Sequence, residues 1–353
     1  MNKYDGGKAM PEKIKKQFEA YSETVKGDSP LYSYITKHLA ENETLMLKLT
    51  PHYFNAHFIS LYLTSIVKHL YVHEDSLRDY FLNFTTEPKK PSKDLMNEFL
   101  NFQEEHFSSI LSDIERYNLK KNIVERSSVL IPVFQHIIKL SGQADFNVVE
   151  LGSKGGLLLN YDWYGYTFNK KIEIGNTEEF NIKVKLNGYD EGFNISELNH
   201  PYKKIGITKN KIDLTLEDEY FWLMSLYYPE ETKRRKQFMK ARKVFLDHPV
   251  EILEGDELKL LPSVLESLPQ NEAVILFHVH VTKNWSDEKK QQLMQIITDY
   301  SSKHEIYHVH HQIFNNDIYL DSFIDGKLQR HKLAHFDLNA LTIDWLYNQK
   351  VIF

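Results

Sequence analysis

The chain has 353 residues, and 42% of them are apolar, so it can bury a sizeable core in about two domains. Its formal net charge of -6 gives no overall attraction to a phosphate backbone, so we expect no nucleic-acid partner. The absence of cysteine excludes disulfides, thiolate metal sites and cysteine nucleophiles.

No stretch approaches the roughly 18 uninterrupted apolar residues of a membrane span, and the first residues contain no apolar run of signal-peptide length. We therefore expect no membrane contact and a cytoplasmic location. The many lysine, asparagine and isoleucine residues are typical of proteins from AT-rich bacterial genomes.

The first third of the chain has apolar residues at helical spacing, without strand-like alternation. Helices are predicted over residues 31–40, 53–72, 77–84 and 95–117. Ser29 and Pro30, directly before the first of them, are residues that commonly begin a helix. This pattern predicts an all-helical N-terminal domain over residues 1–122.

From residue 123 onward, strand-like and helical segments alternate. Short apolar runs predict strands over residues 146–151, 250–253, 273–281 and 305–314. Helices are predicted over residues 129–140, 155–162, 216–228, 231–246, 257–268 and 287–300. Two-residue alternation predicts a β-rich insertion over about 165–215 and a terminal hairpin, residues 318–323 and 328–336, around Asp325 and Gly326.

This alternation predicts a mostly parallel sheet with right-handed crossovers and helices on both faces. A terminal hairpin added to such a sheet is the methyltransferase variant of this architecture. The predicted fold of residues 123–353 is therefore α/β, Rossmann-like and of the methyltransferase type.

The loop after the first predicted strand is the main candidate for cofactor binding. Gly152 permits a tight turn, and Ser153, Gly155 and Gly156 would expose backbone N–H groups at the start of a helix. Open α/β sheets bind ligands at this edge. Glu150, at the strand end, suits a cation such as the amino or sulfonium end of S-adenosylmethionine. The alternative is a tight strand–helix turn that binds no ligand.

Short segments along most of the chain carry a resemblance to a known family: Ser29-Pro30-Leu31-Tyr32, the helix after Pro51, Asn122, Glu125-Arg126-Ser127-Ser128-Val129-Leu130, Glu150-Leu151-Gly152, Gly156-Leu157, Asp213, Trp222-Leu223, Tyr228-Pro229, Arg234, Gly255-Asp256 and Phe277-His278. In these segments the chain resembles a divergent member of a bacterial family known only as a domain of unknown function. The resemblance implies a methyltransferase-like Rossmann domain and names no substrate.

The chain departs from the expected pattern at three places. Lys154 replaces the middle glycine of the methyltransferase loop, and residues 120–123 read Lys-Lys-Asn-Ile where the family usually has Gln-Thr-Asn-Glu. Thr208 stands near the end of the second strand, where the family usually has an acid that would hold the ribose hydroxyls. These departures favour an alternative in which the fold is kept and the cofactor is not bound.

Asp256 follows the short strand at residues 250–253. In methyltransferase-like sheets an acid at this place often contacts the adenine amino group, so Asp256 is a candidate cofactor ligand. The alternative is that Asp256 caps the following helix, a common role for aspartate.

His278 and His280 are the candidate catalytic bases. They are two residues apart on one predicted strand, so we expect them to face the same way near its carboxyl end. The alternative is a pair of packed, hydrogen-bonded histidines. Together with His308, His310 and His311 they would be able to hold zinc, but no ligand spacing is defined, and we predict no metal site.

Arg126 is the third candidate catalytic residue. It would approach the glycine loop from the helical region and pair with Glu150 or with a substrate carboxylate. The alternative is a structural role at the start of the helix over residues 129–140.

The leading functional hypothesis is S-adenosylmethionine-dependent methyl transfer to an unknown small molecule. The alternative is a non-catalytic protein of the same fold that binds a ligand or a protein partner.

Overall fold

The structure is a computed structural model that describes residues 6–55, 57–143, 146–188, 198–270, 272–324, 327–337 and 339–346. The chain divides into two compact units, with residues 1–121 and 216–236 in unit 1 and residues 122–215 and 237–353 in unit 2. The sequence pattern places residues 216–236 with the α/β domain. In the structure, residues 216–236 instead belong to the same unit as the N-terminal helices. Trp222 Nε1, for example, donates a hydrogen bond to the Asn118 carbonyl at 3.1 Å.

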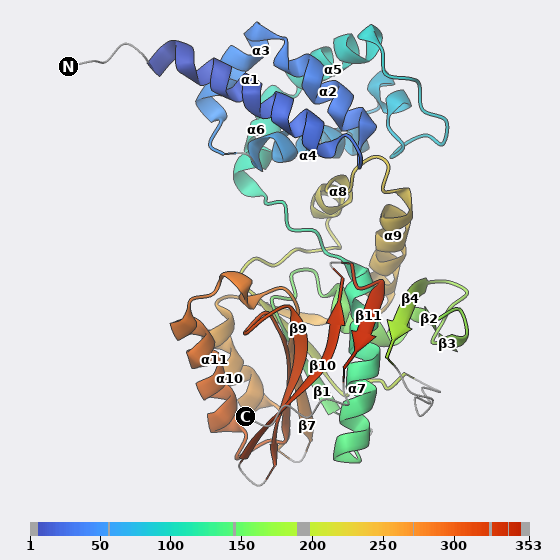
Figure 1. Cartoon of the computed structure of the whole chain (residues 1–353), viewed down its shortest axis with the longest axis vertical. Helices are drawn as coiled ribbons and strands as arrows, with labels where there is room; N and C mark the ends of the chain where they lie inside the picture. Colours follow the sequence, from blue (N-terminus) through green and yellow to red (C-terminus); the bar gives the residue numbers. More distant parts are fainter. Residues whose placement is uncertain are drawn as a thin grey trace, which may run out of the picture. The chain divides into compact units, whose positions relative to one another are not determined.

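Unit 1 is helical throughout the part that the structure describes. Its α-helices are α1 (Gly6–Val25), α2 (Pro30–Ala40), α3 (Glu43–Leu49), α4 (His57–Val72), α5 (Lys93–Glu105), α6 (Phe107–Arg116), α8 (Glu217–Ser225) and the start of α9 (Thr232–Asp247). Two 3₁₀ helices cover Thr50–His52 and Ser76–Tyr80. Figure 1 shows α1 and α2 lying side by side.

The predicted start of α2 is confirmed, since the Ser29 side chain accepts a hydrogen bond from the Tyr32 amide. Other boundaries need correction. The single helix predicted over residues 95–117 is broken at His106 into α5 and α6. The helix predicted over 53–72 begins only at His57, because Pro51 lies in a 3₁₀ turn, and residues predicted as helix at 77–84 form only the 3₁₀ helix Ser76–Tyr80.

Unit 2 is built on a mostly parallel sheet, as the sequence predicts. Its described strands are β1 (Phe146–Leu151), β2 (Gly165–Phe168), β3 (Ile172–Ile174), β4 (Asn181–Asn187), β5 (Lys204–Thr208), β6 (Glu251–Glu254), β7 (Ala273–His278), β8 (Ile306–His311), β9 (Asp317–Ile324), β10 (Lys327–Phe336) and β11 (Thr342–Trp345). They are ordered β3-β2-β4-β11-β10-β9-β8-β7-β1-β5-β6.

Five neighbouring strands, β6-β5-β1-β7-β8, are all parallel and form the block that carries the candidate site. Within this block the chain moves from β1 outward to β5 and β6, and then returns to β7 on the other side of β1. The carboxyl ends of β1 and β7 therefore lie at the point where the strand order reverses. Such a point is where open α/β sheets leave a crevice for ligands.

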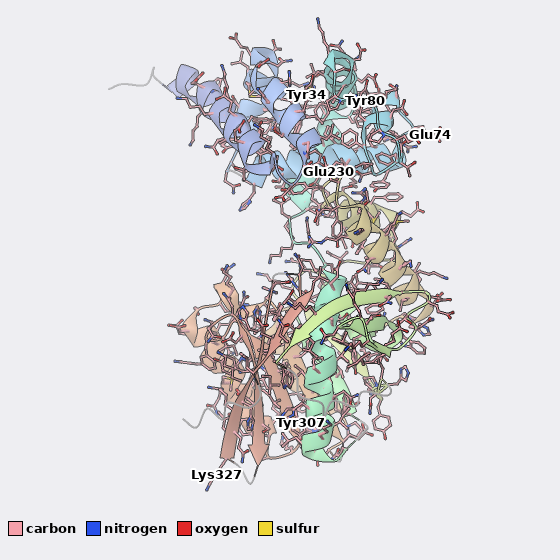
Figure 2. All side chains as sticks on the ribbon, turned by 45° about the vertical axis from the view of Figure 1, so that its right-hand side comes forward. Tyr34, Glu74, Tyr80, Glu230, Tyr307 and Lys327 are labelled. Atoms are coloured by element: carbon pink, nitrogen blue, oxygen red, sulfur yellow. The ribbon has the colours of Figure 1, made fainter. Side chains whose placement is uncertain are left out.

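Helices cover both faces of this block (Figure 1). On one face, α10 (Glu257–Ser267) and α11 (Asp287–Tyr300) pack on an apolar core that includes Val149, Leu276 and Ile306. On the other face lies α7 (Ser127–Ser141), whose Phe134 ring is 5.9 Å from that of Phe277. Tyr307 of β8 faces the same way and lies beside the C-terminal end of α7 (Figure 2).

The terminal hairpin is confirmed as the antiparallel pair β9–β10, although its predicted turn residues, Asp325 and Gly326, lie outside the described residues. The β-rich insertion is smaller than predicted. Strands β2, β3 and β4 belong to it, whereas β5 pairs with β1 in the parallel block. Strand β11, which no sequence pattern predicted, joins the insertion to the hairpin through β4 and β10.

Among the described residues, no helix has both the length and the apolar character needed to cross a membrane.

Candidate functional site

Three candidate residues lie at the carboxyl edge of the parallel block, as the sequence predicts. Glu150 is the second-to-last residue of β1, His278 is the last residue of β7, and Asp256 follows β6 by two residues. Because these strands are parallel, their carboxyl ends meet at one edge. Their side chains do not form one cluster, however, since Glu150 and His278 point to opposite faces of the sheet.

The loop after β1 turns through left-handed backbone at Gly152 (φ 73°), Lys154 (φ 52°) and Gly156 (φ 71°). Lys154 therefore occupies a conformation that glycine adopts more readily. The helix predicted over residues 155–162 is a 3₁₀ helix, Leu157–Trp163. An α-helix start with its fan of free amides does not follow this loop, and the Gly156 amide is already bonded to the Ser153 carbonyl at 2.8 Å.

Two of the loop glycines are required by the packing of the chain itself. A Cβ atom at Gly152 would lie 2.6 Å from a methyl carbon of Val281. A Cβ atom at Gly156 would lie 2.7 Å from Val250 and 2.9 Å from Ile252. The packing of the chain therefore accounts for both glycines without a ligand. This agrees with the alternative prediction that the loop is a tight strand–helix turn that binds no ligand.

Glu150 is not explained by packing. It is 4% exposed, and its Oε2 atom has no hydrogen-bond partner among the described residues. Burial raises the pKa of Glu150 to about 8, although the Lys154 charge opposes this shift. The nearby Ser153 hydroxyl is also buried without a partner, in space that Gly206 of β5 leaves open. A buried carboxyl group with an unused oxygen is suited to receive a cation.

The prediction that His278 and His280 face the same way is wrong. Strand β7 ends at His278, and His280 lies beyond it with left-handed backbone (φ 59°). The His280 ring is therefore turned toward His311, at a centroid distance of 4.3 Å, whereas His278 contacts His308 on the face covered by α10 and α11.

Of the two histidines, His280 is the one close to the glycine loop. Burial lowers the pKa of His280 to about 3, and the charges of Arg126, Lys283 and Lys154 contribute. Lys154 also acts on Glu150 and Arg126 also acts on His311, so these side chains share one region at the β1–β7 edge. At neutral pH the His280 ring is uncharged, and its Nε2 atom has no hydrogen-bond partner among the described residues.

His278 belongs instead to a buried polar network on the opposite face. Its Nε2 atom lies 3.2 Å from Nε2 of His308, and burial holds its pKa well below the usual range. His308 Nδ1 and His310 Nε2 lie 3.9 Å and 3.3 Å from Oδ2 of Asp321. The packed, hydrogen-bonded alternative therefore describes His278 better than a role as a base near Glu150.

Asp321 is the anion at the centre of this network. Burial raises its pKa, but the Arg330 guanidinium and the His308 and His310 rings outweigh burial and hold it well below the usual range. Arg330 donates to both carboxylate oxygens at 2.6 Å and 2.7 Å. Asp321 and Arg330 therefore form a buried, bidentate ion pair, whose charge-assisted hydrogen bonds are stronger than those between neutral groups.

Among the described residues, His308, His310 and Asp321 are close enough to share a metal ion, with ligand atoms within 4.8 Å of one another. His280 and His311 are not part of this group. The positive charge of Arg330, already bound to both oxygens of Asp321, opposes a divalent cation here.

Asp256 has the capping role that was the alternative to adenine contact. Its Oδ1 atom accepts from the Leu258 and Lys259 amides at the start of α10, at 3.1 Å and 3.2 Å. One carboxylate oxygen is thus committed to the helix.

Asp321 and Arg330 were not predicted as site residues from the sequence. Only the cross-strand register of the hairpin β9–β10 places them opposite each other and beside the histidines of β8. His308 and His310 were predicted to lie on one strand, but no local signal identified its partner strand.

Comparison of the sequence with known protein families identifies the family of the chain. Residues 15–345 match a family described as uncharacterised proteins conserved in bacteria, DUF2332. The chain belongs to this family. No curated protein and no solved structure matches the chain. The family resemblance in the sequence is thereby confirmed, and the family itself carries no assigned activity.

Proposed function

We propose that the protein is an S-adenosylmethionine-dependent methyltransferase that acts on a small molecule. The observation that carries the proposal is the unpartnered, buried Oε2 atom of Glu150 beside the loop after β1. The strand order β6-β5-β1-β7-β8 supports it, because it is the order of doubly wound sheets that bind nucleotide cofactors where the order reverses.

The residues present fit the cationic end of the cofactor. Glu150 would bind the amino or sulfonium group, and ionisation of the carboxyl group would be favoured by that contact. When bound, the cofactor would supply an activated methyl group. The chain's own contribution is to hold the reacting groups in place and to exclude water.

His280 and Arg126 are the residues proposed to act on the substrate. The uncharged His280 ring would accept a hydrogen bond from the attacking group at its Nε2 atom, and the Arg126 charge would orient an anionic part of the substrate. Thr208 ends β5, so the ribose would be bound without the usual acid.

The second candidate is a non-catalytic protein of the same fold. The specific observation that favours it is the packing of Val281 against Gly152 and of Ile252 against Gly156, which fills the space that glycines often leave for a cofactor.

Ligand-induced thermal stabilisation separates the two candidates. With S-adenosylmethionine at about 100 times the dissociation constant, the wild-type protein should gain roughly 2.7 kcal/mol of stability. Glu150→Gln should reduce this gain strongly, because a neutral amide cannot form an ion pair with the amino or sulfonium group of the cofactor. Glu251→Gln, an exposed glutamate at the start of β6, is the matched control and should behave as wild type. No stabilisation at millimolar cofactor would favour the non-catalytic candidate.

A further inference from the structure

Three histidines gather in unit 1. His69 and His73 are four residues apart around the C-terminal end of α4, which places them on one face of the helix. His106 lies at the break between α5 and α6. The His106 ring centroid is 5.6 Å from that of His69 and 4.3 Å from that of His73.

One ring nitrogen from each of these histidines lies within 4.8 Å of the others. His69 and His106 are partly buried and His73 is exposed, as is Glu74 beside it (Figure 2). The rings are stacked, so a shared ion would require them to rotate until their nitrogens converge. Side chains at a half-exposed surface have room for that rotation.

A buried carboxylate holds one of the three rings. His69 Nε2 lies 3.2 Å from Oδ2 of Asp113. Asp113 itself is fixed by the Ser65 hydroxyl at 2.8 Å and the Lys68 ammonium at 2.6 Å. A carboxylate on the far nitrogen of a histidine is the usual second contact of a metal-binding ring, because it sets the ring orientation and raises its basicity.

The electrostatic surroundings suit a cation. The C-terminal end of α4 carries the negative end of the helix dipole. The carboxylates of Glu105 and Asp75 lie close enough to act on His106.

We propose that His69, His73 and His106 bind one zinc ion. Three neutral imidazoles are a common zinc ligand set, and a site with three protein ligands keeps a fourth position open to water. The site is independent of the proposed methyltransferase function, since all of its residues belong to unit 1.

The test uses the full chain without a histidine tag, treated with a chelator and then titrated with zinc chloride in a calorimeter. Wild-type protein should bind one zinc ion at this site, and His73→Ala should weaken its binding about tenfold or more. His73 is exposed, so its loss should leave folding unchanged. Asp113→Asn should also weaken binding, by about 10–100-fold, through loss of the contact that orients His69.

His57→Ala is the matched control, because His57 is an exposed histidine at the start of the same helix and is not in the cluster. It should bind zinc as wild type does. The proposal is overturned if the wild-type protein binds no zinc, or if His73→Ala binds it with unchanged affinity. An equal loss in His57→Ala and His73→Ala would overturn it as well.

Discussion

Replacing Arg330 with methionine should destabilise the protein by about 3–5 kcal/mol, because it leaves a buried carboxylate without its partner. The Asp321 side chain is fully buried, and Arg330 donates to both of its oxygens. A charged neighbouring ring would be a costly substitute for the guanidinium, since burial is the main reason that the pKa of His310 is lowered to about 4. Urea unfolding at pH 7 measures the loss.

The double variant Asp321→Asn with Arg330→Met separates the ion pair from the packing of the arginine. Removing both charges should recover much of the loss, because no uncompensated charge stays buried. Lys26→Met is the surface control. Its partner Glu23 and Lys26 itself have side chains that are 70% and 68% exposed, so little change is expected. A loss in Arg330→Met no larger than in this control would contradict the assigned role of the pair.

Glu150→Gln should remove a pH dependence of about 5 kcal/mol from the stability curve. The folded-state pKa of Glu150 is raised to about 8, above its ordinary value of 4.5. Between these pH values the folded protein binds a proton that the unfolded chain has lost. The wild-type free energy of unfolding should therefore fall as the pH rises from about 4.5 to 8.

The difference between the wild-type and Glu150→Gln proteins isolates the contribution of Glu150 to the pH dependence of the free energy of unfolding. Burial also lowers the pKa of His280 to about 3 and of His311 to about 4, so these rings make stability rise with pH from about 3 to 6.5 in both proteins. Their contribution cancels in the difference between the two unfolding curves. A difference that does not vary with pH would show that Glu150 is solvated or paired in the folded protein.

Sequence patterns predicted the parallel block well, because buried strands and their following turns carry strong local signals. The glycine-rich turn after β1 and the apolar run of β7 placed Glu150 and His278 at the correct edge. Asp256 was predicted as a cofactor ligand with helix capping as the alternative, and it has the capping role, which depends on two amides close after it in the sequence.

Sequence periodicity did not predict which way the histidine side chains at this edge of the sheet point, or which residues they contact. Strand β7 ends three residues earlier than predicted, and the left-handed backbone at His280 turns its ring away from His278. The Asp321–Arg330 pair follows from the register of β9 and β10, which is set by pairing in the folded sheet. The grouping of residues 216–236 with unit 1 likewise depends on long-range contacts such as that of Trp222 with Asn118.

The most direct test of the proposed cofactor site is calorimetry of S-adenosylmethionine binding at pH 7 in two buffers with different heats of ionisation. At this pH the Glu150 carboxyl group is mostly protonated, and it must ionise to bind a cation. Wild-type protein should release most of one proton per cofactor bound, and Glu150→Gln should bind weakly without releasing that proton. Absence of binding to the wild-type protein, or binding that is identical in both proteins and linked to no proton release, would contradict the role of Glu150 as the cofactor's counter-ion.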